Sequence, residues 1–320
     1  MPRFGEFEPK GVIPACLLPF HDDFSIDEPG YRKHLRDVVG VAGINAITVN
    51  AHASEAAACS DEEQERVLAL TMDEVGDRIP VINGIYADGS HYAARLARMA
   101  ERGGASCLLV FPPSPMAMGG QLRPEMALAH FKTIADASDL PIILFQYPLA
   151  GGLGYPLDTL LRLVDEVPQI RAIKDWCNDA MLHERQVREL QGLVRPVRVL
   201  STHSSWLMSS LVMGCGGLLS GAGSVIADLQ VALFQAVQKK DLARAQAIND
   251  RLYPVQQAFY APPFLDMHNR MKEALVLLGR MERAVVRPPL VKIGAGEIER
   301  LRMAIAQARL TTAGALDLAA

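Results

Sequence analysis

Short apolar runs of strand length alternate along the chain with longer stretches in which apolar residues recur at helical spacing. Each short run is apolar at consecutive positions, which is typical of parallel strands covered by helices. Ser60 and Glu63 have capping-box spacing, so a helix is expected to begin there. We expect strands at 11–20, 44–50, 80–85, 106–111, 141–147, 170–176, 197–202 and 217–221. The expected intervening helices are 27–40, 60–75, 88–102, 123–138, 156–166, 179–190, 203–213 and 224–238.

Eight strands that are each followed by a helix predict an α/β fold, the (β/α)8 TIM barrel. A doubly wound open sheet is the alternative, but no G-x-G-x-x-G motif follows any strand, so a dinucleotide site has no support. Beyond the last strand, further helices are expected at 241–260, 266–280 and 295–310. We therefore divide the chain into a barrel at 1–240 that carries the active site and a C-terminal helical extension at 241–320, frayed from 311 onward.

Composition and charge limit the kinds of partner. The chain has 320 residues, 50% of them hydrophobic, and its 32 basic and 36 acidic residues give a formal net charge of −4. A nucleic-acid or anionic-membrane partner would require a concentrated basic surface. No apolar run approaches the roughly 20 residues of a membrane helix, and residues 1–11 lack the apolar stretch of a signal peptide. The five cysteines are far apart and form no C-x-x-C pair. We expect a soluble cytoplasmic protein with a small-molecule substrate.

The active site of such a barrel lies at the carboxyl ends of its strands. Eight polar residues end or follow the apolar runs, namely His52, Glu55, Ser114, Tyr147, Lys174, Asp175, His203 and Ser220. Of the eight lysines, only Lys174 lies inside an apolar strand, in the segment IRAIKDW. Burial lowers the pKa of a lysine toward the neutral amine that Schiff-base catalysis requires. Position alone leaves two interpretations open, which are this nucleophile and a structural lysine paired with a carboxylate on a neighbouring strand.

A set of motifs around Lys174 resembles the dihydrodipicolinate synthase/N-acetylneuraminate lyase family of class I, Schiff-base-forming lyases. IRAIKD resembles the strand that carries the Schiff-base lysine, and LPIILFQYP resembles the strand with Y-N-x-P. VNAHASEAAACSDEEQERV stands where the family has its G-[ST]-T-G-E loop and the next helix. The remaining matches are GVIPACLLPFHDDFSID near the start and, later, MGCGGLLSG and MKEALVLLG.

The resemblance implies a (β/α)8 barrel with a helical C-terminal extension, assembled as a homo-oligomer, a tetramer or a dimer. It also implies that Lys174 condenses with the keto carbon of pyruvate or another 2-oxo acid. The imine then acts as the electron sink for C–C cleavage, aldol addition or dehydration, so no metal or organic cofactor is expected.

One departure from the family concerns the acid/base group. The proton-shuttling tyrosine, three residues before the proline of Y-N-x-P, is replaced here by Phe145. Tyr147 lies two residues further on, and alternate strand residues face the same side. Tyr147 is therefore expected to point into the barrel, displaced about 6–7 Å toward its mouth. It is either a relocated acid/base or a cap on the barrel with its hydroxyl in solvent.

A second departure affects the loop that holds the substrate carboxylate in the family. Here the loop has Ala51, His52, Ala53, Ser54 and Glu55, so both family hydroxyl residues are missing. Backbone amides of His52 and Ala53 and the Ser54 hydroxyl are expected to take over, with Ser220 also lining the acid-binding pocket. His52 is a candidate acid/base or a cationic carboxylate ligand, or it only satisfies loop backbone groups. Glu55 is expected to order the loop.

Further departures concern the substrate partner. The family's P-Y-Y segment ends here in Ser114, and the arginine that dihydrodipicolinate synthases use to bind a dicarboxylic partner falls at Ala150. No lysine or arginine occurs between Lys132 and Arg162. We therefore argue against dihydrodipicolinate synthase activity itself.

The leading hypothesis is a Schiff-base aldolase, lyase or hydro-lyase with Lys174 as nucleophile and Tyr147 and His52 as proton-transfer residues. A non-catalytic protein that binds a small oxo acid is the alternative, because it would also have lost the family tyrosine and threonine. A mononuclear metal site of His52 and His203 with Glu55 or Asp175 is a third, although no H-x-H or H-E-x-x-H spacing supports it.

Overall fold

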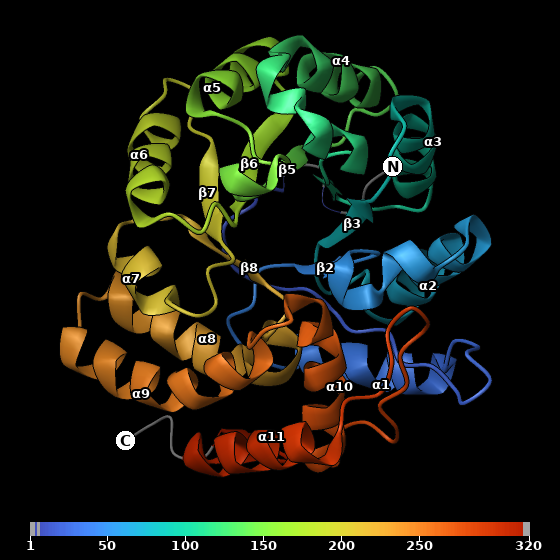
Figure 1. Cartoon of the computed structure of the whole chain (residues 1–320), viewed down its shortest axis with the longest axis vertical. Coiled ribbons are helices and arrows are strands. Elements are labelled where there is room, and N and C mark those ends of the chain that lie inside the picture. Colours follow the sequence, from blue (N-terminus) through green and yellow to red (C-terminus); the bar gives the residue numbers. More distant parts are fainter. Residues whose placement is uncertain (1–3, 5–6, 316–320) are drawn as a thin grey trace.

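Eight parallel strands form the barrel at the centre of the molecule (Figure 1). The computed structural model describes residue 4 and residues 7–315. Hydrogen bonds connect the strands in the order β1-β8-β7-β6-β5-β4-β3-β2, and single bridges join residues next to β1 and β2. The predicted (β/α)8 barrel is confirmed. The strands are β1 (Gly11–Pro14), β2 (Ile47–Val49), β3 (Val81–Ile85), β4 (Cys107–Val110), β5 (Ile142–Gln146), β6 (Ile170–Asp175), β7 (Arg198–Ser201) and β8 (Gly217–Ser220).

A helix follows every strand, as the alternating pattern predicts. The start of α2 has the expected capping box, in which Ser60 and Glu63 each bond the backbone N–H of the other. The largest difference is in α7, which begins four residues later than 203 because residues 203–206 make tight turns next to the barrel mouth. The helices are α1 (Glu28–Val39), α2 (Asp61–Val75), α3 (Ser90–Arg102), α4 (Pro124–Ala135), α5 (Leu157–Glu166), α6 (Ala180–Gln191), α7 (Leu207–Val212) and α8 (Gly223–Gln238).

The first strand is shorter than the apolar run that predicts it. Pairing with β8 ends at Pro14, and residues 15–20 are fully buried but irregular. At the other end of β1, a Cβ built on Gly217 would lie 2.2 Å from the carbonyl oxygen of Gly11, so only glycine permits this close approach. The apolar run therefore reports burial correctly and strand length wrongly.

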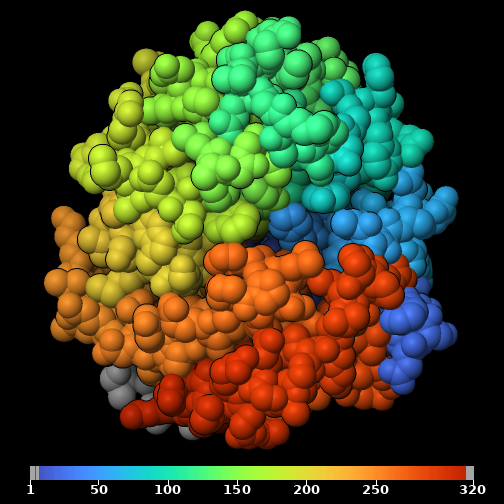
Figure 2. All heavy atoms as spheres, in the orientation of Figure 1, coloured from blue at the N-terminus to red at the C-terminus, as the bar shows by residue number. Residues whose placement is uncertain are grey.

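The C-terminal region is helical, as predicted, but does not end in a frayed tail at 311. It contains α9 (Leu242–Phe259), α10 (Met267–Leu277) and α11 (Ala295–Gln307), followed by a short antiparallel hairpin, β9 (Leu310–Thr311) with β10 (Gly314–Ala315). Residues 316–320 lie outside the described part of the chain. In Figure 2 the orange and red C-terminal segment covers the lower half of this face of the molecule and extends to the centre of the barrel.

The apolar core fills the barrel and the space between strands and helices. In the part of the chain that the structure describes, no helix combines the length and apolar character needed to cross a lipid bilayer.

Candidate active site

Lys174 lies near the end of β6 at the bottom of a small pocket at the carboxyl ends of the strands. Only 5% of the lysine is exposed. Residues of the barrel and of the C-terminal region line the pocket together, so residues 1–240 do not build it alone. They are Ala15, Ala51, His52, Ala53, Phe145, Lys174, Trp176, Thr202, Gly221, Tyr260, Met267 and His268.

The amine of Lys174 has no carboxylate partner among the described residues. Its Nζ lies 4.0 Å from the centre of the Phe145 ring. Burial lowers the pKa of Lys174 from 10.5 to about 7. At pH 7 about half of the amine is therefore neutral, compared with about 1 in 3,000 for an exposed lysine. The alternative of a structural lysine in an ion pair finds no carboxylate partner among the described residues, and the buried amine is compatible with a nucleophile.

Tyr147 and His52 are brought together, although only His52 lines the Lys174 pocket itself. The Tyr147 hydroxyl lies 3.1 Å from Nε2 of His52, although the two residues are 95 positions apart. The hydroxyl is therefore bonded within the protein and is not simply a cap exposed to solvent. Burial raises the pKa of Tyr147 well above 10, so its hydroxyl stays protonated. The two side chains form a connected donor–acceptor pair at the mouth of the barrel.

Burial also settles the charge of His52. Desolvation, together with the nearby Lys174, lowers the pKa of His52 to about 3. Its ring packs against aromatic rings, with centroid separations of 4.8 Å to Phe111 and 5.9 Å to Phe145. A lowered pKa gives no support to the expectation of a cationic His52 that binds a carboxylate. Nε2 of His52 shares one hydrogen bond with the Tyr147 hydroxyl.

The loop after β2 forms a tight 3₁₀ turn at His52–Ser54. Ser54 turns its hydroxyl away from the pocket and donates a hydrogen bond to the Cys16 carbonyl at 2.9 Å. The substrate contact expected of the Ser54 hydroxyl is therefore not supported. Ala53 lines the pocket, and its backbone N–H belongs to the first turn, where no intrahelical acceptor is available. That N–H fits the expected role in holding a carboxylate.

Ser220 lies one layer behind the pocket wall. Its Oγ is fully buried, lies 3.0 Å from Oγ of Ser204 and accepts a hydrogen bond from Gln230 at 3.2 Å. Tyr260, which does line the pocket, packs over the two serines and accepts a hydrogen bond from the backbone N–H of Ala222 at 3.3 Å. The direct substrate contact expected of Ser220 is thus replaced by support of Tyr260.

Glu55 orders the loop through a buried ion pair with Lys272 of α10. It holds a left-handed backbone conformation with φ 51°, and its second oxygen accepts the backbone N–H of Arg287 at 2.9 Å. Lys272 is fully buried, although its sequence position on a helix gave no sign of a buried charge. The contact ties the substrate loop to the C-terminal region.

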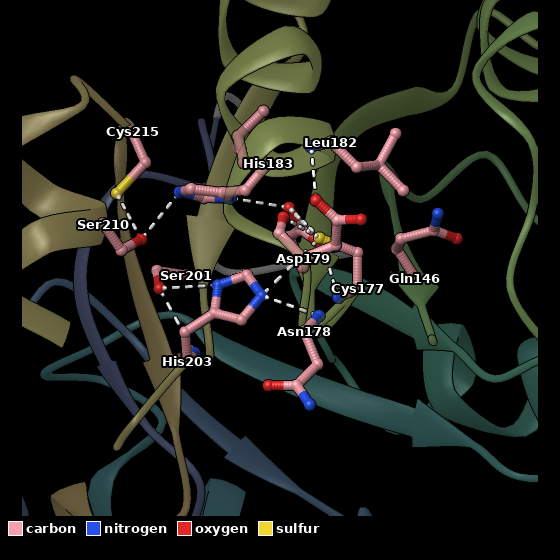
Figure 3. Close-up of polar contacts among 12 residues, drawn as sticks. Gln146, Cys177, Asn178, Asp179, Leu182, His183, Ser201, His203, Ser210 and Cys215 are labelled. Atoms are coloured by element: carbon pink, nitrogen blue, oxygen red, sulfur yellow. Dashed lines mark hydrogen bonds and ion pairs between the residues drawn. The ribbon is translucent and has the colours of Figure 1, made fainter. Parts of the chain in front are cut away.

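A buried polar chain lies behind β6, where it contacts helices α6 and α7 (Figure 3). Asp175 lies 2.7 Å from Nδ1 of His183, and Nε2 of His183 lies 2.7 Å from Oγ of Ser210. Burial alone lowers the pKa of His183, but the hydrogen bonds and charges of Asp175 and Cys215 together outweigh it and raise the pKa to about 9. The resulting imidazolium–carboxylate pair fixes the end of the strand that carries Lys174.

The metal site considered from the sequence is not assembled, since His52 lies in the Lys174 pocket and bonds Tyr147. Within residue 4 and residues 7–315, the one set of three potential ligands within 4.8 Å of one another is Asp175, Cys177 and His203. Nε2 of His203 already accepts the backbone N–H of Asn178 at 3.2 Å. Burial and the neighbouring Asp175 raise the pKa of the Cys177 thiol. These donors satisfy one another as a hydrogen-bonded cluster.

Seven lining residues were missed by sequence reasoning, among them Ala15 and Gly221, which carry no functional side chain. Trp176 and Thr202 end strand-like runs and are recognisable by the carboxyl-end rule that found Lys174. Tyr260, Met267 and His268 come from the C-terminal region, for which no pattern in the sequence indicates contact with the barrel mouth.

Comparison with known proteins agrees with this architecture. The model of the dihydrodipicolinate synthetase family matches residues 8–308. A 4-hydroxy-tetrahydrodipicolinate synthase of Kineococcus radiotolerans is 31% identical over 311 residues, 94% of each chain. One of Methanopyrus kandleri is 28% identical over 297 residues, 92% of this chain and 95% of the relative. The fold of a prophage protein of Escherichia coli K12, solved with pyruvate, is similar at a TM-score of 0.86 and 22% identity, covering 94% of this chain and 99% of that one. The chain belongs to the dihydrodipicolinate synthetase family.

Proposed function

We propose that this protein is a Schiff-base-forming lyase, an aldolase or hydro-lyase, that acts on pyruvate or another 2-oxo acid. The observation that carries the proposal is the buried, carboxylate-free amine of Lys174, with a pKa of about 7, in a pocket at the carboxyl ends of the strands. Membership of a family of lyases supports the same chemistry. A protein that only binds an oxo acid has no need of a neutral lysine amine, so the depressed pKa favours the enzyme.

The reaction begins when neutral Nζ of Lys174 attacks the keto carbon of the substrate. A C–N bond forms, the carbonyl oxygen takes up protons and leaves as water, and a protonated imine remains. In C–C cleavage, the electron pair of the bond between the third and fourth carbons flows into the imine and gives an enamine. In dehydration, loss of a proton from the third carbon gives the enamine, whose electrons then expel the hydroxyl of the fourth carbon, and this hydroxyl takes up a proton and leaves as water. Tyr147, kept protonated by burial, and neutral His52 are the groups that pass protons in these steps. The N–H of Ala53 holds the substrate carboxylate.

The pocket does not favour the dicarboxylic partner of dihydrodipicolinate synthases. Among the residues that line it, Lys174 is the only lysine or arginine. Ala150 lies in an exposed turn at Leu149–Gly151, and Ser114 begins an exposed segment at Ser114–Met118. A second carboxylate would therefore enter this pocket without a cationic side chain other than Lys174 to pair with, which is unfavourable.

Trapping of the imine tests the proposal directly. Borohydride added with pyruvate, and in parallel with several other 2-oxo acids, is expected to leave one reduced adduct at Lys174, located by mass spectrometry of the digested protein. Lys174→Arg keeps the charge but not the nucleophile, so this variant is expected to give no adduct. The proposal fails if the wild-type protein forms none with any of the acids tested.

Assembly and location are part of the same proposal. Met118 and Leu122, in the segment that follows β4, are 87% and 84% exposed, and such apolar exposure supports a homo-oligomeric contact. We expect a tetramer or a dimer, which light scattering after size exclusion measures. A cytoplasmic location stays a prediction from the cysteine pattern.

A further inference from the structure

His268 enters the Lys174 pocket from the C-terminal region. It is the second residue of α10 and is only 8% exposed. A Cβ built on Gly221, just after β8, would lie 3.0 Å from Nε2 of His268, so the ring edge reaches the carboxyl end of that strand. His268 and Gly221 both line the pocket. The ring is therefore part of the pocket wall and not of the apolar core.

The ring nitrogens of His268 have no hydrogen-bond partner among the described residues, which distinguishes this residue from the other buried histidines. Each of those has at least one ring nitrogen bonded, namely His34, His130, His183 and His203. The His268 nitrogens are not among the fully buried atoms that lack a partner, a set that does include Nε2 of His130. They are therefore open to the pocket that the ring lines, and a ligand in that pocket can bond them.

The groups around His268 keep it neutral. Burial lowers its pKa well below 6.5, and the positive charges of Lys174, Lys272 and protonated His52 lower it further. Of these, Lys272 is paired with Glu55, and His52 is itself neutral at physiological pH. A neutral imidazole offers one N–H donor and one acceptor, and a hydroxyl group can bond to either, whereas a carboxylate can use only the donor and gains no ion pair.

The rest of this side of the pocket agrees with a hydroxyl ligand. Tyr260 and Thr202 provide neutral hydroxyl groups, and Trp176 provides an aromatic edge. The Tyr260 hydroxyl is already used in the hydrogen bonds with Ala222 and the serines beneath it. Among the described lining residues, the His268 ring and the Thr202 hydroxyl thus keep unused hydrogen-bonding capacity, and of the two His268 comes from the C-terminal region.

We propose that His268 contacts the substrate and determines specificity, by hydrogen-bonding a hydroxyl group on the carbon chain of a hydroxylated 2-oxo acid held on Lys174. This inference rests on the proposed function, because the lysine adduct places the carbon chain in the pocket. It makes the C-terminal region a part of the active site. It also selects a hydroxylated chain over an unsubstituted or dicarboxylic one.

A matched pair of acids tests the inference. 2-Oxobutanoate and 4-hydroxy-2-oxobutanoate differ by one hydroxyl. The ratio of the concentrations that give half-maximal borohydride trapping at Lys174 therefore measures how much that hydroxyl contributes to binding. A single buried hydrogen bond corresponds to roughly a tenfold difference. We expect the wild-type protein to trap the hydroxy acid at about one tenth of the concentration. In His268→Leu we expect the two concentrations to become equal, and in His268→Gln, which keeps a donor and an acceptor, most of the preference is expected to remain.

A control variant at another histidine separates a specific role of His268 from a general effect of the substitution. His130→Gln alters another buried histidine, on α4, and is expected to leave the ratio of the two concentrations at its wild-type value. If wild-type and His268→Leu give the same ratio, the inference is wrong while the proposed function stands. If neither acid forms an adduct with the wild-type protein, the proposed function itself fails. If His268→Leu does not fold by circular dichroism, loss of the preference in His268→Asn decides, and an unchanged ratio there overturns the inference.

Discussion

The depressed pKa of Lys174 can be reversed by placing a carboxylate in its pocket. Thr202 follows β7, lines the same pocket and is only partly buried, so Thr202→Asp introduces a negative charge beside the amine without filling the core. An opposite charge within about 4–6 Å raises the pKa of a lysine by about 1–3 units. Thr202→Asn has nearly the same shape and no charge, and serves as the matched control.

The size of the effect follows from the pKa of about 7 for Lys174. A rise to between about 8 and about 10 lowers the neutral fraction at pH 7 from about one half to between about 10% and 0.1%. Because only the neutral amine is nucleophilic, its reaction at pH 7 is expected to slow by about 5- to 500-fold. Above pH 10 the rates of the Thr202→Asp, Thr202→Asn and wild-type proteins are expected to converge.

Competitive labelling with acetic anhydride, an uncharged reagent, measures the pKa of the Lys174 amine without a charged substrate. The rate at Lys174 is followed by mass spectrometry from pH 5 to pH 11, and the midpoint of the profile gives the pKa. We expect a midpoint near 7 for the wild-type protein and Thr202→Asn, and a higher one for Thr202→Asp. A wild-type midpoint near 10 would show that burial does not lower the pKa. Equal midpoints for the Asp and Asn variants would show that residue 202 does not face the amine.

Three further outcomes are expected. Tyr147→Phe should lower turnover by about 10²- to 10⁴-fold while borohydride trapping at Lys174 persists, and loss of both would instead indicate a folding defect. Lys272→Met leaves Glu55 charged, buried and without its ion-pair partner, and should lower the free energy of unfolding in urea by about 3–5 kcal/mol. The double variant with Glu55→Gln should recover most of that stability. An unchanged free energy of unfolding in the single variant would contradict the ion pair. Burial lowers the pKa of three histidines from 6.5 to about 4, so their unfolded forms bind protons first and stability falls as the pH drops below 6.5. The three are His34, His130 and His203. At pH 5 each should lower the free energy of unfolding by roughly 2 kcal/mol. Urea denaturation at several pH values from 7 to 5 would measure this loss, and a free energy of unfolding that does not change with pH would refute it.

The order of strands and helices was predictable because each strand of this barrel is buried on both faces. The resulting runs of consecutive apolar residues are short and regularly spaced, and the helices between them have clear amphipathic patterns. The same signal failed at residues 15–20, which are buried and make only single bridges instead of a continuous strand, because apolarity reports burial and not strand pairing. The β9–β10 hairpin was missed because strands of two residues carry no periodicity.

The candidate site was predictable where the barrel itself supplies it. Lys174, Tyr147 and His52 all follow or end a strand, and the fold gathers such positions at one end. His268 and Lys272 were not predictable in this way, because they depend on how α10 docks on the barrel mouth. That docking is set by long-range contacts such as the ion pair with Glu55, which no local pattern encodes.

The departures from the family pattern are connected through contacts among the residues concerned. Phe145, which replaces the family tyrosine, lies 4.0 Å from the Lys174 amine and packs against Tyr147 with their ring centroids 4.5 Å apart. Tyr147 in turn bonds His52, which stands where the family carries a hydroxyl residue. A polar group at 145 would solvate the amine, whereas the phenyl ring keeps the amine desolvated. The Tyr147 hydroxyl finds its hydrogen-bond partner in His52. Replacing His52 by a residue with a shorter side chain is therefore expected to leave the Tyr147 hydroxyl without this partner.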